Sequence, residues 1–266
     1  MKNPPTMQKT AIVTGAYGVI GRAIAEIMAE NGWRLILLGR DATKIKTVCQ
    51  EIIKNSGNSS IEPVCVDLSR EAEIRSFALS LNESADVLIN NAGTTPKTRL
   101  ETPEGIEMQW ACNVLGYAWC MDYLMPKINP SGRIVNVASF YAGGLDLSDV
   151  EFIKRKYDND AAYKQSKQAN RMLSAHFATL YQSKEVTVNS CHPGEINSKL
   201  SNNLGFFFTD PPRKGADTPV WVATDESLKG KTGRYFQYRH EMLCPVSKNP
   251  MDNKALYDLC KTYYGR

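Results

Sequence analysis

A tyrosine and a lysine four residues apart could form a proton-transfer pair. The stretch AYKQSK (162–167) places Tyr163 and Lys167 at the spacing that brings two side chains to one face of a helix. Reduction of a carbonyl needs a proton at oxygen, and a positive charge beside a tyrosine favours the phenolate and lowers its pKa. The same spacing is common on solvated helix surfaces, so the chemistry depends on what surrounds the pair.

Three glycines could bind a phosphate group. The segment TGAYGVIG (14–21) follows an apolar run of strand length and opens a helix-like segment, with glycines at 15, 18 and 21. Such a turn lets backbone N–H groups approach a pyrophosphate at a helix N-terminus. A purely structural turn is the alternative, but a strand before and a helix after the glycines favour a dinucleotide site.

The end of the next apolar run bears on the choice of cofactor. The run RLILLG ends at Gly39, which offers no carboxylate to a ribose diol, and Arg40 follows it. A guanidinium suits the 2′-phosphate of NADP. Asp41 could bind the diol of NAD instead, but DATK has the pattern of a helix N-cap. We therefore expect NADP, with NAD less favoured; the alternative for Arg40 is a solvated surface charge.

Apolar runs of strand length alternate with helix-like segments along the chain. Strands are predicted at 10–14, 34–39, 61–66, 86–90, 132–139, 186–191 and 233–237, and helices at about 19–30, 41–54, 69–81, 104–125 and 160–182. This alternation predicts an α/β fold, a doubly wound (Rossmann-type) parallel sheet with helices on both faces. No repeat or linker divides the sequence, so a single domain over 1–266 is expected. Ligands of such folds bind at the carboxyl ends of the strands.

The bulk properties exclude several classes of protein. The 266 residues carry a net charge of +4 without a long basic block, so no nucleic-acid partner is expected. Seven cysteines without a Cys-x-x-Cys motif predict reduced core thiols and no metal site. The N-terminus MKNPPTMQ is too short and polar for a signal peptide, and no apolar stretch approaches 18 residues. We therefore expect a cytoplasmic protein without a membrane-spanning segment.

Several motifs in a fixed order resemble those of the short-chain dehydrogenase/reductase superfamily. They are TGAYGVIG (14–21), VDLS (66–69), NNAG (90–93), CNVLG (112–116), NVAS (136–139), the Tyr163/Lys167 pair and HPGEINS (192–198). The resemblance covers nearly the whole chain. By this resemblance the residues that would bind the cofactor are Gly15, Tyr17, Gly18, Val19, Ile20, Gly21, Arg40, Asp67, Leu68, Asn91, Ala92, Gly93, Tyr163, Lys167, Pro193, Gly194, Ile196 and Ser198.

The resemblance also implies a catalytic set. Tyr163 would be the acid/base, and Lys167 would favour its phenolate and contact the nicotinamide ribose. Ser139, predicted at a strand end, would hydrogen-bond the substrate oxygen, and Asn113 would hold a water that links Lys167 to solvent. Ser139 alone would more often be a plain strand-end hydroxyl and Asn113 a packing residue, so these roles depend on one another.

Within the superfamily the chain looks most like the retinol dehydrogenase and WW-domain oxidoreductase group. The cues include TPEGIEMQWACNVLGY, YKQSKQANRML and a gap of 24 positions between Ser139 and Tyr163, about twice the usual gap. Two features of the chain differ from what is usual in the superfamily and in this group. The middle glycine of the first motif comes one residue early, at Gly18, with Val19 in its usual place. Many retinol dehydrogenases also carry an N-terminal membrane anchor, whereas this chain reaches its first predicted strand almost at once.

The segment 198–219 is expected to cover the substrate. It contains Phe206, Phe207 and Phe208, which would line a site for a lipophilic aldehyde or ketone. Packing into the core, or into a contact between subunits of a homo-oligomer, explains the phenylalanines equally well. The expected function is an NADP-dependent oxidoreductase that interconverts a small-molecule carbonyl and an alcohol. An NAD-dependent alcohol dehydrogenase and a non-catalytic nucleotide-binding regulator are the alternatives.

Overall fold

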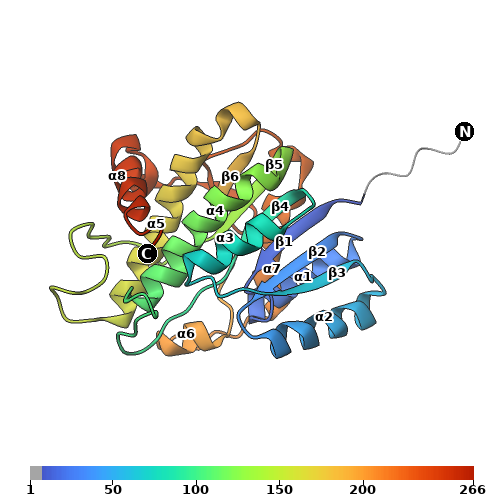
Figure 1. Ribbon diagram of the computed structural model, residues 1–266, viewed down its shortest axis with the longest axis horizontal. Helices are drawn as coiled ribbons and strands as arrows, with labels where there is room; N and C mark the ends of the chain where they lie inside the picture. The colour runs from blue at the N-terminus through green and yellow to red at the C-terminus, as the bar shows by residue number, and fades with distance from the viewer. Residues whose placement is uncertain (1–7) are drawn as a thin grey trace, which may run out of the picture.

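One eight-stranded sheet organises the computed structural model, which describes residues 8–266 (Figure 1). The strand order is β3-β2-β1-β4-β5-β6-β7-β8, and every neighbouring pair is parallel except β7 and β8. The strands are β1 Thr10–Thr14, β2 Arg34–Gly39, β3 Ile61–Cys65, β4 Ala85–Asn90, β5 Ile128–Val137, β6 Thr187–His192, β7 Tyr235–Gln237 and β8 His240–Met242. The order reverses between β1 and β4, where a doubly wound sheet opens a crevice at its carboxyl edge.

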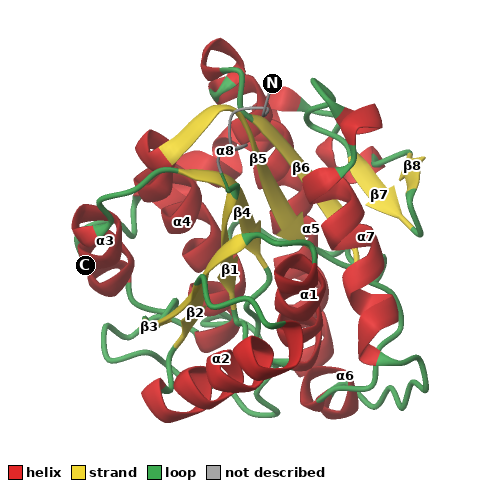
Figure 2. Ribbon diagram, turned by 90° about the vertical axis from the view of Figure 1, so that its right-hand side faces the viewer, coloured by secondary structure: helices red, strands yellow, loops and turns green. Residues whose placement is uncertain are grey.

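Helices cover both faces of the sheet, as Figure 2 shows. The α-helices are α1 Val19–Glu30, α2 Ala42–Ser56, α3 Glu71–Ser80, α4 Gly116–Leu124, α5 Asn159–Leu180, α6 Lys199–Asn203, α7 Pro212–Thr224 and α8 Pro250–Lys261. Trp110–Leu115 is a π-helix, and short 3₁₀ helices span Met125–Lys127, Gln182–Lys184, Glu226–Leu228 and Pro245–Ser247. Helices α1, α2 and α7 pack on one face and α3, α4 and α5 on the other, with α8 against α5.

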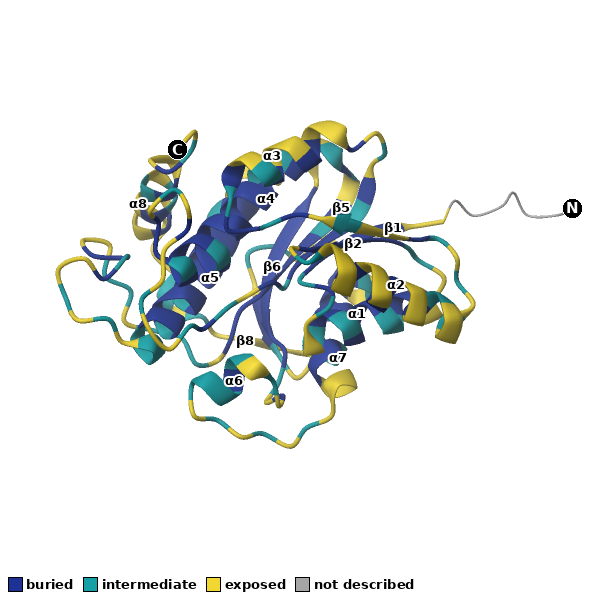
Figure 3. Ribbon diagram, turned by 60° about the horizontal axis from the view of Figure 1, so that its bottom comes forward, coloured by how far each residue is buried: buried dark blue, intermediate teal, exposed yellow. Residues whose placement is uncertain are grey.

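The alternation of side chains along each strand explains the two layers. In β1, Ala11 and Val13 belong to the apolar cluster under α1, α2 and α7, whereas Ile12 belongs to the cluster under α3, α4 and α5. Strands that are apolar on both faces are what a sheet buried between two helix layers needs. Figure 3 shows the central strands buried and the outer surface of α2 exposed, whereas α1 is mostly buried or intermediate. The predicted Rossmann-type fold is confirmed.

The eighth strand was not predicted, and it makes the sheet mixed rather than wholly parallel. Strand β8 returns antiparallel to β7 through a two-residue turn at Tyr238 and Arg239, whose φ angles are 47° and 62°. Asn-Gly or Asp-Gly is the usual sequence for two successive positive φ angles. Because neither turn residue is a glycine, the sequence carries no hairpin signal here.

The helix predicted from residue 104 begins later. Residues 101–107 form a small loop closed by an isolated bridge between Glu101 and Glu107, with Gly105 at φ 77°. Helical structure begins at residue 108 and passes through the π-helical segment before α4. The predicted start was therefore wrong, because Gly105 adopts a left-handed conformation within the loop that precedes the helix.

The segment 198–219 divides into two parts. Residues 199–203 form α6, which lies apart from both helix layers in Figure 3. Residues 212–219 instead begin α7, which packs beside α1 and buries Ala216 and Val220 in the core. This second part belongs to the helix layer and not to a cover, so the expected covering role remains a prediction for residues 198–211.

Candidate active site

Strand β5 and helix α5 bring the predicted catalytic residues together. Asp158 caps α5 by accepting from the backbone N–H of Ala161 at 2.7 Å, which starts the helix just before the tyrosine. Tyr163 and Lys167 lie on its buried face and are 8% and 3% exposed. The Nζ of Lys167 donates to the carbonyl of Val137 at 3.0 Å and lies 5.8 Å from the centre of the Tyr163 ring. The pair is therefore not solvated.

Burial governs the protonation of this pair. It raises the pKa of Tyr163 to about 12, while the nearby Ser139 hydroxyl acts in the opposite direction. The two hydroxyls are close enough for this effect without forming a regular hydrogen bond, and the Oγ of Ser139 accepts from the N–H of Tyr141 at 3.1 Å. Burial also lowers the pKa of Lys167 to about 8. In this structure burial raises the pKa of Tyr163, and Lys167 does not lower it as expected.

Asn113 lies beside the lysine. It sits in the π-helical segment, a feature that often occurs at functional sites. Its Oδ1 accepts from the N–H of Thr94 at 2.8 Å, and its Nδ2 donates to the Thr94 carbonyl at 3.0 Å. A Cβ placed on Gly93 would lie 3.5 Å from the Oδ1 of Asn113 and 4.0 Å from the Nζ of Lys167. Asn113 thus ties Thr94, which follows the NNAG motif, to Ser166 of α5 at 3.3 Å, next to Lys167. Its expected water-holding role stays a prediction.

The glycine turn has the close backbone approach that a phosphate cradle needs. Gly15 has φ 66°, and a Cβ there would lie 2.8 Å from the Cα of Ala92. A Cβ on Gly21 would lie 2.3 Å from the carbonyl oxygen of Gly15. Gly18 is the N-cap of α1 and provides no side-chain cap, so the first N–H groups of the helix, from Val19 onward, are not covered by a capping side chain. The early middle glycine is therefore compatible with a helix N-terminus open to an anion.

Thr14 joins the turn to the NNAG loop, a contact that the sequence did not reveal. Its hydroxyl accepts from the N–H groups of Asn91 and Ala92 at 2.8 and 3.0 Å. The side chain of Asn91 donates to the Thr14 carbonyl at 3.0 Å. These bonds hold the carboxyl ends of β1 and β4 together at the reversal point of the sheet.

Arg40 and Asp41 differ in how they are engaged. Asp41 accepts from the N–H of Lys44 at 3.0 Å and pairs with its ammonium group at 3.0 Å, which confirms the predicted N-cap of α2. Arg40 is exposed and takes part in no salt bridge within residues 8–266. The ring of Tyr17 lies against Gly39, since a Cβ at Gly39 would be 2.6 Å from it. This end of β2 thus offers a free guanidinium beside an aromatic ring.

The remaining predicted cofactor residues lie on the loops after β3 and β6. Asp67 accepts from the N–H of Ser69 at 3.0 Å, and Leu68 is buried, its carbonyl close against Gly116 at the start of α4. After β6 come Pro193, Gly194 at φ 111°, the buried Ile196 and Ser198, which caps α6. A Cβ placed on Gly215 would lie 2.6 Å from Ile196 and 3.2 Å from Ile20, so this loop and α1 meet at α7.

An aromatic group flanks the catalytic pair. Phe206 packs edge-on against Tyr141, two residues after Ser139, and stacks on Phe208 at 5.5 Å. Phe207 points away and is 78% exposed. Helix α6 is held nearby, because Asn203 donates to the carbonyl of Thr95 at 2.9 Å. Two of the three phenylalanines are therefore linked through Tyr141 to the segment that follows Ser139.

Two polar residues near Ser139 were missed as site residues. Arg171 follows Lys167 by four positions, so the same spacing that joins Tyr163 to Lys167 could have placed it on this face of α5. It donates to the carbonyl of Ser139. His192 lies at the end of β6 and is buried, which lowers its pKa to about 4.

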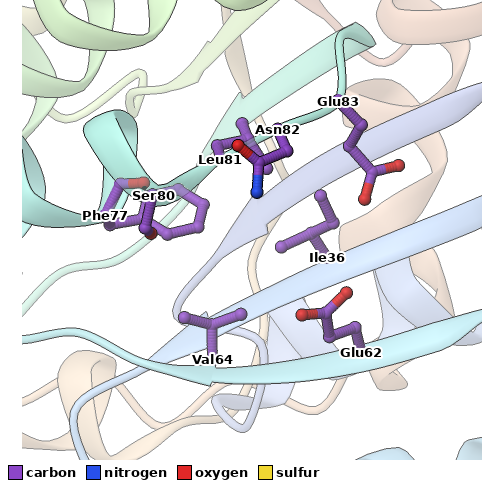
Figure 4. Close-up of a pocket in the computed structure, with 8 residues that line it drawn as sticks. All are labelled: Ile36, Glu62, Val64, Phe77, Ser80, Leu81, Asn82 and Glu83. Atoms are coloured by element: carbon purple, nitrogen blue, oxygen red, sulfur yellow. Dashed lines mark hydrogen bonds between the residues drawn. The ribbon is translucent and has the colours of Figure 1, made fainter.

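Two cavities lie away from this cluster. One, of about 300 Å³, opens between α3 and the strands β2 and β3, where Ile36, Val64 and Phe77 line it (Figure 4). The other, of about 270 Å³, lies near the amino ends of β1, β4 and β5. Neither contains a predicted site residue. Within residues 8–266 no cluster of metal-ligating side chains was found, and no helix there has the length and apolar character to cross a bilayer.

Comparison with known families identifies the chain. The family model described as short chain dehydrogenase matches residues 9–205. The chain belongs to the short-chain dehydrogenase family. Members of this family are oxidoreductases that bind a nicotinamide dinucleotide, so this short-chain dehydrogenase is an enzyme of that class.

Two curated relatives indicate which group within the family the chain resembles. Human retinol dehydrogenase 13 is 32% identical over 86% of this chain and 76% of its own length. Human retinol dehydrogenase 11 is 33% identical over 94% of this chain and 84% of its own. The predicted likeness to retinol dehydrogenases is confirmed.

Solved structures support the same fold. An uncharacterised protein of Mycobacterium paratuberculosis superimposes with a TM-score of 0.83 at 24% identity, covering 98% of this chain and 95% of its own. The Pseudomonas aeruginosa RhlG/NADP active-site complex gives 0.68 at 25% identity, covering 88% and 96%. The first comparison bears on the fold alone.

Proposed function

We propose that this short-chain dehydrogenase is an NADP-dependent reductase of lipophilic aldehydes or ketones, with Tyr163 as proton donor. The observation that carries the proposal is the buried cluster of Ser139, Tyr163 and Lys167 at the carboxyl end of β5. This cluster lies beside Gly93, and Gly93 belongs to the loop that Thr14 joins to the glycine turn.

The chain's own groups divide the work as follows. The nicotinamide supplies the hydride, so the protein contributes binding, orientation and a proton. The N–H groups at the start of α1 hold the pyrophosphate, and Lys167 holds the nicotinamide ribose. Ser139 donates a hydrogen bond to the substrate oxygen and stabilises the charge that develops there. Tyr163 gives its phenolic proton to the same oxygen.

The protonation states favour reduction near neutral pH. A pKa of about 12 keeps Tyr163 in the neutral form that can donate a proton, and a pKa of about 8 keeps Lys167 mainly positive. Oxidation of an alcohol needs the phenolate instead. The oxidation rate should therefore rise as the pH increases, whereas reduction should already be supported at pH 7.

Arg40 supports NADP as the cofactor. Its guanidinium is exposed and not engaged in an ion pair within the described residues, while the neighbouring Asp41 is occupied at the N-cap of α2. A free guanidinium can form charge-assisted hydrogen bonds with a 2′-phosphate. The solved complex of Pseudomonas aeruginosa RhlG with NADP supports this choice.

The aromatic side chains support a lipophilic substrate. Tyr141, Phe206 and Phe208 contact one another beside Ser139, and residues 198–211 would cover the substrate from that side. The names of the two retinol dehydrogenases point to a long apolar alcohol as one class of substrate for those relatives. For this chain we infer only the shared lipophilic character.

A panel of aldehydes and ketones tests the proposal. Purified protein is assayed with NADPH and with NADH against aldehydes of increasing chain length. We expect turnover with NADPH and a kcat/KM that rises with chain length. Preference for NADH would favour the alternative NAD-dependent alcohol dehydrogenase. Binding of NADPH without turnover of any member would favour a nucleotide-binding regulator.

A further inference from the structure

A buried arginine lies directly behind Ser139. Arg171 is two helical turns beyond Tyr163 on α5 and is 8% exposed. Its Nη2 donates to the main-chain carbonyl of Ser139 and, at 2.8 Å, to the hydroxyl of Tyr235 in β7. The guanidinium lies over the ring of Tyr235, 3.7 Å from its centre. Arg171 thus connects α5, β7 and the residue that follows β5.

This guanidinium has no acidic partner. No salt bridge within residues 8–266 includes Arg171, and its Nε has no hydrogen-bond partner there. Nearby His192 is neutral at pH 7, since burial and the charge of Arg171 lower its pKa to about 4. An unpaired buried charge is costly, and apolar residues often replace such groups without loss of stability. Core packing alone therefore does not account for an arginine here.

The carbonyl that Arg171 binds lies where the sheet stops. The last pair of residues between β5 and β6 is Val137 and Cys191, and the N–H of Ala138 still donates to the Cys191 carbonyl at 2.8 Å. Ser139 comes after this last sheet bond. Its carbonyl is held by Arg171 and its Oγ by the N–H of Tyr141. These two contacts fix the direction of the hydroxyl that acts on Tyr163.

We propose that Arg171 is a positioning residue for the reduction, which acts by holding the Ser139 carbonyl so that the serine hydroxyl faces Tyr163. The inference rests on the proposed function, because it assigns Arg171 to the same Ser139–Tyr163 site. Tyr235 supports it by presenting a flat ring and a hydroxyl to one guanidinium. A lysine at this position would keep the positive charge. It could not stack a planar group on the Tyr235 ring while bonding to the Ser139 carbonyl and the Tyr235 hydroxyl.

Removal of the guanidinium should loosen Ser139. In Arg171→Met we expect kcat to fall about tenfold to a hundredfold, since small misplacements of a reacting group have effects of that size. The affinity for NADPH, measured by fluorescence, should not change. The nearby Ser139 hydroxyl favours the phenolate of Tyr163, so its displacement should move the pH profile of alcohol oxidation to higher pH. Arg171→Lys should restore part of the rate, and Tyr235→Phe, which keeps the ring, should shift the profile less.

Arg133→Met is the matched control. Arg133 lies within β5, six residues before Ser139, and donates to the carbonyls of Val222 and Asp225 at 3.2 and 2.8 Å. Its loss should lower the melting temperature without moving the pH profile. A second readout needs no turnover: hydrogen exchange of the Tyr141 amide, which donates to Ser139, should speed up about tenfold in Arg171→Met but not in Arg133→Met.

The two proposals can fail separately. If the wild type has no activity, the proposed function fails, and the Tyr141 exchange comparison alone decides the role of Arg171. Wild-type kcat and pH profile in Arg171→Met, or exchange no faster than in Arg133→Met, would overturn the positioning role. If Arg171→Met does not fold, Arg171→Lys and Tyr235→Phe take its place, and wild-type behaviour in both would overturn it equally.

Discussion

The hydroxyl of Tyr163 is the only group assigned a proton transfer in the proposed reaction. Replacement by phenylalanine keeps the ring and removes that hydroxyl. We expect Tyr163→Phe to lower kcat by about a hundredfold to ten-thousandfold, the usual range for loss of a general acid, while NADPH still binds. Single-turnover reduction of an aldehyde and fluorescence titration of NADPH measure the two effects.

A buried tyrosine away from the site provides the control. Tyr181, at the C-cap of α5, donates to the carbonyl of Met121 at 2.8 Å. Tyr181→Phe should cost stability but leave kcat nearly unchanged. Near-normal turnover in Tyr163→Phe would remove the phenol from the mechanism.

Arg40 governs the expected preference between the two cofactors. Charge-assisted hydrogen bonds to a phosphate are worth about 1.5–3 kcal/mol, less when exposed to salt. Since about 1.4 kcal/mol is a factor of ten, Arg40→Ala should reduce the NADPH/NADH ratio of kcat/KM about tenfold, and less at high salt. Lys54→Ala removes the same charge from the last turn of α2 and should leave the ratio unchanged. A wild-type preference for NADH, or an equal effect of both variants, contradicts the assignment.

At the scale of residues, motifs and their order located the cluster but not its electrostatics. Tyr163, Lys167, Ser139 and Asn113 could be proposed because spacing and strand ends are readable in a sequence. The direction of the Tyr163 pKa could not, because it depends on how completely the phenol is buried. Close packing at Gly39 could not be predicted from the sequence either. The ring of Tyr17 occupies the space that a Cβ there needs, so a variant such as Gly39→Asp would force the ring to move.

The helix that carries Asn113 begins on a buried carboxylate. Glu107 accepts from the N–H groups of Gln109 and Trp110 at 2.9 and 2.6 Å, and its own N–H donates to Glu151 at 2.9 Å. Burial raises the pKa of Glu107 from 4.5 to about 7; the Glu151 carboxylate adds to this, and the two N–H bonds and Arg99 oppose it. Tyr157 also lies against this carboxylate.

This raised pKa predicts a pH-dependent stability. Between pH 4.5 and 7 the folded protein keeps the Glu107 proton that the unfolded chain loses, so the free energy of unfolding should fall as the pH rises. At about 1.4 kcal/mol per pH unit the contribution is at most about 3 kcal/mol. Urea unfolding at pH 5 and pH 8 measures it in the wild type and in Glu107→Gln, which should lack this contribution. Glu101→Gln, an exposed neighbour across the bridge, should keep the wild-type slope; an equal slope in Glu107→Gln contradicts the prediction.

At the scale of elements, the apolar strand runs could be recognised in the sequence, but the helices α6, α7 and α8 were not predicted. Helix α7 contains Pro212, Gly215 and Pro219, residues that weaken a helical pattern, and only packing beside α1 stabilises it. Helix α8 was not predicted because few of its residues are buried. Its buried face can be recognised only once its contact with α5 is known. Strand β8 was not predicted because the turn that precedes it contains no glycine.

The larger of the two apolar clusters runs through most of the chain. It includes Ile12 in the first strand, Leu173 and Phe177 in α5, and Leu256 in α8. On the outer side, Tyr257 of α8 packs against Phe177 and donates to Asp122 of α4 at 3.1 Å. From the continuity of this cluster we propose that the chain unfolds as a single cooperative domain.

Leu256 provides a test at the scale of the whole molecule. It is fully buried, although it lies only ten residues from the end of the chain. If residues 8–266 unfold as one unit, Leu256→Ala should lower the global free energy of unfolding by about 2–5 kcal/mol, the usual cost of a leucine-sized cavity. The loss should be the same by tryptophan fluorescence and by far-ultraviolet circular dichroism, with one transition in each. Met251→Ala, exposed on the same helix, should change stability by less than about 0.5 kcal/mol. If α8 instead unfolds on its own, circular dichroism will record a small early transition in Leu256→Ala while the main transition stays in place, and the single-domain prediction for 1–266 is then wrong.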